Sequence, residues 1–112
     1  IIHAVERIRR DACSGLTAAD VLAEIGLSRR LAEKRFRAAT GRTILGEIQE
    51  VRFDRVLQLL RETDLPIGQL AGLCGWESDS YLKRFFKKRT GLTLREGRAR
   101  RIDAGNMIYC PA

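Results

Sequence analysis

An internal repeat constrains the fold of this chain more strongly than any other sequence feature. The first copy is an apolar run closed by glycine, followed by a serine, a phenylalanine and a second glycine: Val21–Gly26, Ser28, Phe36 and Gly41. The second copy keeps that order: Leu70–Gly75, Ser78, Phe86 and Gly91. The offset is about 49 residues before the turn and about 50 after it, so the second turn has gained one residue. The fold must therefore contain one small structural unit twice.

Each copy has the pattern of a helix-turn-helix unit. Apolar residues recur at the i, i+3, i+4 spacing of helices, and the period-2 alternation of strands is absent. A glycine opens a turn of about three residues between two such segments, as in a helix-turn-helix. We expect the small Ala23 and Ala71 to let the paired helices approach each other, and we expect Leu31 and Leu73 to point inward.

The complete pattern predicts an all-α fold of seven helices, with two helix-turn-helix subdomains joined by a long central helix. Capping residues and glycines bound helices at residues 1–12, 17–26, 28–40, 43–62, 66–75 and 78–90, with a short one from 93 onward. We predict an N-terminal helix-turn-helix subdomain over 1–42, a linker helix over 43–62, a C-terminal helix-turn-helix subdomain over 63–101 and a tail over 102–112. The linker helix is apolar on more than one face, which predicts partners on both sides.

The second helix of each unit is predicted to present a polar and basic outer face. In the first unit this face contains Arg29, Arg30, Glu33, Lys34 and Arg37. In the second unit it contains Asp79, Ser80, Lys83, Arg84 and Lys87. Side chains of these types form hydrogen bonds with base edges and phosphates. We expect the N-terminal half of each such helix to read bases, and its later basic residues to contact phosphates.

The length of the linker helix suits two reading units on one duplex. A helix of about 20 residues spans roughly 30 Å. Successive major-groove faces on one side of B-form DNA lie about 34 Å apart. We therefore predict a sequence-specific DNA-binding domain that inserts two recognition helices into adjacent major grooves of double-stranded DNA.

Composition supports this prediction and disfavours other classes. The formal net charge of +7 favours a polyanionic partner. Cys13, Cys74, Cys110 and the single His3 are scattered, so we expect no metal site and no cofactor. An odd number of cysteines suits a reducing cytoplasm, and no apolar run approaches the roughly 20 residues of a membrane span. One histidine offers no nucleophile–histidine–acid set, so we predict no enzyme activity.

Nearly the whole chain, from about residue 1 to 101, resembles the DNA-binding domain of the AraC/XylS family of transcription regulators. The resemblance rests on several motifs at matching intervals: Ala23-x-x-Gly26 with Ser28, Phe36-Arg37-x-x-x-Gly41, Leu59-Leu60, Pro66-Ile67-x-x-Leu70-Ala71, Gly75-Trp76 and Ser78-x-x-Tyr81-Leu82-x-x-x-Phe86-Lys87-Lys88-x-x-Gly91. The run Glu33–Phe36 is also similar to that of the xylose-responsive members.

The resemblance implies roles for particular residues and partners. It implies base reading by Arg30, Glu33, Lys34, Asp79, Ser80, Lys83 and Arg84. We expect phosphate contacts from Ser28, Arg29, Arg37, Ser78, Tyr81 and Lys87. The resemblance implies that an effector-sensing or dimerisation domain normally precedes this one. The absence of an initiating Met suggests a fragment of a longer protein, although processing could also remove such a residue. The resemblance also implies contact with RNA polymerase, and it favours activation over repression.

The last helix departs from the family pattern. Proline commonly follows the threonine at position 93, and an aromatic residue commonly stands at position 97, where this chain has Leu94 and Gly97. We therefore expect the last helix to be less firmly packed.

Several alternatives remain open from the sequence. A basic helical module that binds RNA or a protein without reading sequence is the rival function. Arg52 and Arg55 suit ion pairs with acids as well as contacts to phosphates. Trp76 is expected to pack at the turn rather than stack on a base, and Cys74 is expected in the core. The Tyr81 ring can pack while its hydroxyl reaches a phosphate.

Overall fold

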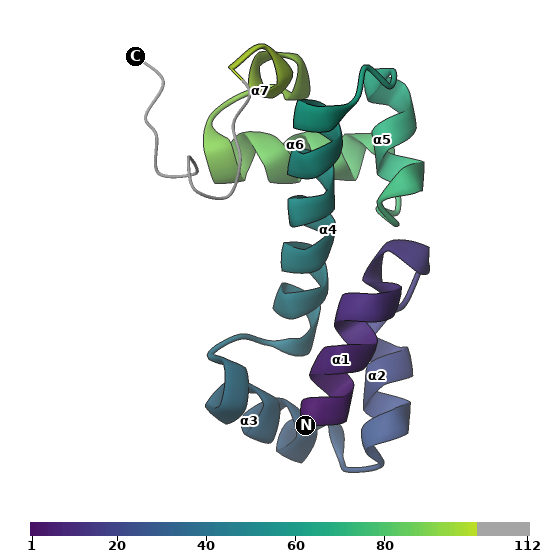
Figure 1. Ribbon diagram of the computed structural model, residues 1–112. Coiled ribbons are helices and arrows are strands. Elements are labelled where there is room, and N and C mark those ends of the chain that lie inside the picture. Colours follow the sequence, from purple (N-terminus) through teal and green to yellow (C-terminus); the bar gives the residue numbers. More distant parts are fainter. Residues whose placement is uncertain (101–112) are drawn as a thin grey trace. The chain divides into compact units, whose positions relative to one another are not determined.

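The computed structural model describes residues 1–100, so the tail predicted over 102–112, which contains Cys110, lies outside the described residues. The described chain forms seven α-helices and no strand, which confirms the all-α prediction (Figure 1). The helices are α1 Ile2–Asp11, α2 Ala18–Ile25, α3 Arg29–Thr40, α4 Ile44–Glu62, α5 Ile67–Leu73, α6 Asp79–Thr90 and α7 Leu94–Arg100. A 3₁₀ turn, Ala12–Ser14, follows α1.

Matching caps set the ends of α3 and α6. The Ser28 hydroxyl oxygen accepts a hydrogen bond from the Leu31 amide at 3.3 Å, and Ser78 accepts from the Tyr81 amide at 3.1 Å. These bonds satisfy backbone donors that have no partner within a helix. Each helix ends at a glycine with φ near +78°, a conformation that disfavours side chains with a Cβ atom. Local chemistry therefore fixes both recognition helices at the predicted ends.

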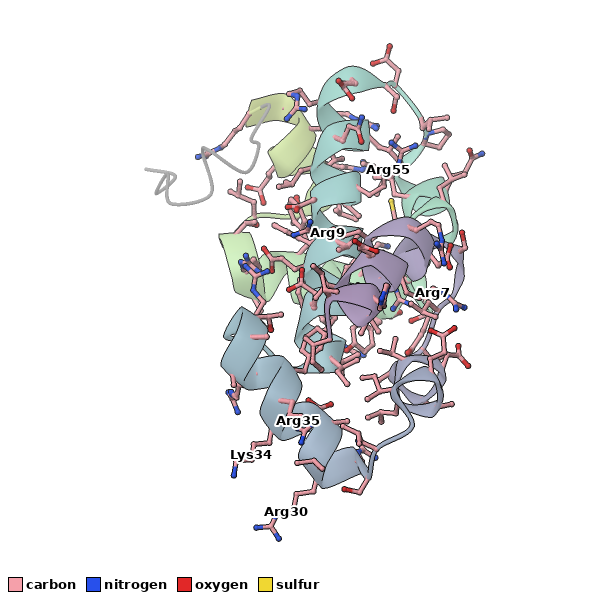
Figure 2. The ribbon with its side chains drawn as sticks, turned by 60° about the horizontal axis from the view of Figure 1, so that its bottom comes forward. Arg7, Arg9, Arg30, Lys34, Arg35 and Arg55 are labelled. Carbon is pink, nitrogen blue, oxygen red and sulfur yellow. The ribbon has the colours of Figure 1, made fainter. Side chains whose placement is uncertain are left out.

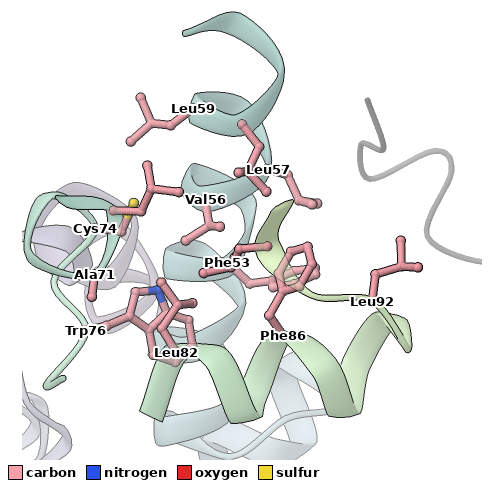
Figure 3. Close-up of a cluster of buried hydrophobic side chains, with 13 residues drawn as sticks. Phe53, Val56, Leu57, Leu59, Ala71, Cys74, Trp76, Leu82, Phe86 and Leu92 are labelled. Atoms are coloured by element: carbon pink, nitrogen blue, oxygen red, sulfur yellow. The ribbon is translucent and has the colours of Figure 1, made fainter. Parts of the chain in front are cut away.

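The described chain packs as two compact units that divide within α4, after Arg52. The first unit has its own core, formed by Ala4, Ile8, Ala12, Leu16, Val21, Phe36, Ile44 and Ile48. The second unit has a separate core, in which side chains of α4, α5 and α6 meet (Figure 3). Its members include Phe53, Leu57, Leu70, Trp76, Leu82 and Phe86. Helix α4 thus supplies apolar side chains to both cores, as its several apolar faces predicted.

Three side chains lie elsewhere than the sequence predicted. Leu31 and Leu73 are 37% and 50% exposed, so the expectation that they point inward is wrong. The adjacent residues Ala32 and Cys74 are buried instead, because successive residues of an α-helix differ by about 100° around its axis. Ala23 is also exposed and lies away from the buried Val21, so the close approach of α2 does not depend on it. Ala71 is buried, as expected.

Trp76 and Cys74 belong to the core of the second unit, as predicted. Trp76 is buried, and its ring centroid lies 4.8 Å from that of Phe85. Cys74 is completely buried. The half-buried Tyr81 packs its ring 5.8 Å from that of Trp76.

Arg52 is a buried structural residue of the first unit. Only 5% of it is exposed, and its guanidinium donates to two backbone carbonyls, from Nε to Ala12 O at 2.8 Å and from Nη2 to Leu16 O at 2.7 Å. Because the guanidinium is buried and already donates to backbone carbonyls, the expectation of a phosphate contact is wrong for Arg52. A helix side chain that reaches carbonyls 36 and 40 residues away leaves no local sequence signal. Arg55 is exposed and donates to the Gln58 side chain.

Gly97 makes a close contact with the core, contrary to the expectation of a loosely packed α7. A Cβ atom at this position would lie 2.7 Å from Cζ of Phe86 and 3.6 Å from Cδ1 of Leu60. Gly97 itself is buried. The absence of a side chain therefore lets α7 approach the ring of Phe86 closely.

We predict that Arg52→Met lowers the free energy of unfolding of the first unit by about 3 kcal/mol. The substitution removes two charge-assisted hydrogen bonds, each worth about 1.5–3 kcal/mol, and leaves the carbonyls of Ala12 and Leu16 without these donors. Urea denaturation measures the change, with Arg55→Met as the control, which should stay within about 0.5 kcal/mol of wild type. Equal effects of the two substitutions would contradict the structural role of Arg52.

We predict opposite signs for two glycine-to-alanine substitutions. Gly97→Ala should lower the free energy of unfolding by about 1 kcal/mol, because overpacking costs about 1–3 kcal/mol and outweighs the gain in helix propensity. Gly72→Ala, within α5, meets no atom within 4 Å and should raise it by up to about 1 kcal/mol. Thermal unfolding of both variants checks this, and a stabilising Gly97→Ala would show that Phe86 moves aside freely.

Candidate nucleic-acid interface

Basic side chains line a groove on the outer face of α3. Arg29, Arg30, Lys34 and Arg37 are exposed, and they border this first groove together with Glu33, Thr43 and Leu45. Figure 2 shows Arg30 and Lys34 extending from α3 away from the rest of the first unit. The groove thus lies between a recognition helix and the start of the next helix, α4.

A second groove has the same position in the second unit. Lys83, Arg84, Lys87 and Lys88 of α6 line it, together with Ile67 and Gly68 at the start of α5 and Thr93, Leu94 and Arg95 around the start of α7. All five basic residues are exposed, and no acidic residue lines this groove. Five cations gathered in one groove create a surface that attracts a polyanion.

The inner faces of α3 and α6 match as closely as their outer faces. Phe36 and Phe86 are both completely buried. One helical turn further on, the hydroxyls of Thr40 and Thr90 donate to the carbonyls of these phenylalanines at 2.8 Å in both units. The sequence repeat is therefore also a structural repeat, in which each copy has one buried phenylalanine on the inner face and one groove on the outer face.

The remaining predicted contact residues lie outside the two grooves. Asp79 and Ser80 are exposed in the first turn of α6. The hydroxyl oxygens of Ser28 and Ser78 accept the capping bonds of their helices, and each hydroxyl still has a hydrogen to donate. The structure thus brings together Arg29, Arg30, Glu33, Lys34 and Arg37 in one groove and Lys83, Arg84 and Lys87 in the other.

Glu33 differs from the other predicted base-reading residues. Its carboxylate oxygen Oε2 accepts a hydrogen bond from the Ile44 amide at 3.3 Å, and its side chain is only partly exposed. The predicted role for Glu33 in base reading therefore competes with a contact inside the protein.

Sequence reasoning missed eight residues that line the grooves: Thr43 and Leu45 in the first, and Ile67, Gly68, Lys88, Thr93, Leu94 and Arg95 in the second. The repeat contained a signal for two of them. Leu45 and Arg95 each stand two residues after the threonine that opens the helix following a recognition helix. Because both copies place that helix start beside the groove, either residue could have been inferred from the other.

The start of α7 carries a reciprocal capping box. Thr93 Oγ1 accepts from the Glu96 amide at 3.2 Å, and Glu96 Oε1 accepts from the Thr93 amide at 2.9 Å. These bonds lower the pKa of the Glu96 carboxyl below its ordinary value of 4.5, first through the Thr93 backbone and then through its side chain. Thr17 and Asp20 form the same box at the start of α2, and the pKa of Asp20 is lowered for the same reason.

Residues 1–100 contain no group of three or more histidine, cysteine, aspartate or glutamate side chains that could hold a metal ion. Among the described helices, none has the length and apolar character needed to cross a membrane.

Comparison with known proteins identifies the family of this chain. Residues 5–100 match the helix-turn-helix domain family. A crystal structure of an AraC-type transcriptional regulator from Chromobacterium violaceum is 29% identical, with a TM-score of 0.76 and 93% of each chain covered. The chain belongs to the AraC-type helix-turn-helix family. Domains of this family serve as DNA-binding domains of transcription regulators.

Two further proteins are similar to this AraC-type domain. The xylose operon regulatory protein of Escherichia coli is 36% identical over 98 residues, which cover 88% of this chain. The AraC-type domain spans only 25% of the length of that relative. The DNA-binding domain of AdpA, described as a global transcriptional factor and solved with a target DNA, is 25% identical, with a TM-score of 0.82. The similarity covers 88% of this chain and 89% of that domain.

We predict that the Thr93–Glu96 capping box makes the second unit less stable in acid. A folded-state pKa lowered below 4.5 means that the stabilisation is present above that pH and is lost as the pH falls through the folded-state pKa. Glu96→Gln should therefore be less stable than wild type at pH 7, and the difference should shrink below about pH 4. Thermal unfolding across this pH range tests the prediction, with Glu77→Gln, outside any cap, as the control. A difference independent of pH would contradict it.

Proposed function

We propose that this AraC-type domain reads a specific DNA site by inserting α3 and α6 into adjacent major grooves of one duplex. The observation that carries the proposal is the repeated groove. Each helix-turn-helix unit buries one phenylalanine of its second helix and presents exposed basic residues on the opposite face. A helix of about 10–12 Å diameter with such a face fits the major groove.

We propose base reading by Arg30 and Lys34 in α3, and by Asp79, Ser80, Lys83 and Arg84 in α6. Arginine and lysine donate to the O6 and N7 acceptors of guanine, whereas a carboxylate accepts from the amino group of cytosine. All six side chains are exposed. The two helices carry different residues at equivalent positions, so they should prefer different half-sites.

Phosphate contacts are proposed for the basic residues at the later turns and rims of the grooves. These are Arg29, Arg37 and Lys87, joined by Lys88 and Arg95. Donation from the hydroxyls of Ser28, Ser78 and Tyr81 is proposed as well. Such contacts would fix the register of each helix on the duplex without reading sequence.

The proposal of adjacent grooves rests on the length of α4. Its 19 residues span roughly 28 Å, compared with about 34 Å between successive major-groove faces. Bending the DNA would close such a difference at a cost of a few kcal/mol. We propose that the chain is divided into two helix-turn-helix subdomains, over residues 1–42 and 63–101, which the linker helix 43–62 joins. The AdpA domain, solved with its target DNA, supports DNA binding by this fold.

The wider setting is also proposed. The similarity to a xylose operon regulatory protein, of which this domain spans one quarter, supports an effector-sensing domain elsewhere in the full protein. We propose that the full protein acts in the cytoplasm and contacts RNA polymerase. We further propose that it activates rather than represses, as the resemblance to AraC/XylS regulators implies.

We predict that Arg84→Ala and Lys87→Ala weaken DNA binding in different ways. On a duplex that the wild-type domain selects from a random pool, Arg84→Ala should cost about 1–3 kcal/mol and relax the preference at one base pair. Lys87→Ala should weaken binding to selected and scrambled duplexes alike, and it should reduce the salt slope by about 1. Binding titrations at several salt concentrations measure both effects.

Arg9→Ala provides the matched control, because it removes an exposed positive charge of α1 outside both grooves. Its affinity should stay close to that of wild type. Equal losses on selected and scrambled duplexes for both Arg84→Ala and Lys87→Ala would count against sequence reading by α6.

A further inference from the structure

The start of α4 is capped by a side chain from the preceding recognition helix. Glu33 lies on α3, and its Oε2 accepts from the amide of Ile44, the first residue of α4, at 3.3 Å. The Ile44 side chain is completely buried in the core of the first unit. A negative carboxylate at a helix N-terminus is stabilising, because the free amides there carry partial positive charge. The bond therefore ties α3 to a fixed point of the first core.

The second copy of the repeat satisfies the start of its following helix differently. There Glu96, three residues after Thr93, accepts from the Thr93 amide within the helix that it caps. The residue at that position in the first copy is Gly46, which has no side chain to accept a bond. Where the first copy has Glu33, the second has the exposed Lys83. The capping carboxylate therefore belongs to the recognition helix in the first copy and to the following helix in the second.

We propose that Glu33 is a positioning residue, which holds α3 at its working rotation against α4, and that it does not read a base. This inference rests on the proposed function, because it assigns a role within the same DNA-reading surface. Arg30 and Lys34 are the exposed residues one turn before and one position after Glu33. A rotation of α3 about its axis moves both side chains. The single bond from Glu33 to α4 therefore fixes the direction in which both of them point.

The experiment compares Glu33→Gln, Glu33→Ala and Arg30→Ala with wild type, using duplexes selected from a random pool. Glutamine keeps an acceptor oxygen for the Ile44 amide, so Glu33→Gln should select the wild-type site. Glu33→Ala should also select that site, but it should bind it roughly fivefold more weakly, the usual scale of a lost helix cap, with a smaller loss on scrambled duplexes. Arg30→Ala is the control for a base-reading residue and should lose preference at one base pair.

Affinities are measured at a temperature where every variant is fully folded, as thermal unfolding establishes. A role confined to stability would lower the melting temperature of Glu33→Ala and leave affinity unchanged, which would overturn the proposal. A changed base preference in Glu33→Gln would also overturn it, since glutamine pairs best with adenine and a carboxylate with cytosine. If the wild-type domain selected no site at all, the proposed function itself would fail, and that outcome is distinct from both.

Discussion

Burial of one phenylalanine on the inner face of each recognition helix is the interaction on which the rest of this structure depends. Phe36 packs into a core that contains Ile44 and Ile48 of α4, and Phe86 packs near Phe53 of the same helix, with ring centroids 5.8 Å apart. Burying a phenylalanine side chain stabilises by about 1.5–3 kcal/mol. With the inner face fixed in this way, the opposite face of each helix must lie in solvent, where its basic residues are free to meet a duplex.

The two copies share this anchor but support their recognition helices with different contacts. In the first unit, the buried Arg52 joins α4 to the carbonyls of Ala12 and Leu16, and Glu33 joins α3 to the start of α4. In the second unit, Gly97 admits α7 against the ring of Phe86. A duplicated unit can therefore keep its reading geometry while its supporting contacts and the residues on its outer face diverge.

Much of this fold could be predicted because its signals are local. Ser28 and Ser78 cap the helices that follow them, and apolar spacing marks the buried side of α4. Spacing alone misplaced Leu31 and Leu73, since a neighbouring residue 100° away around the helix took the inner position. The roles of Arg52, Glu33 and Gly97 depend on partners 11 or more residues away, and no periodic pattern encodes such contacts.

The central claim is that one chain presents two reading helices to a single duplex. Hydroxyl-radical footprinting of the wild-type domain on a duplex selected from a random pool tests this claim most directly. The account predicts two protected blocks on one face of the DNA, with centres about 10–10.5 base pairs apart. A single protected block, or two blocks on opposite faces of the duplex, would contradict it.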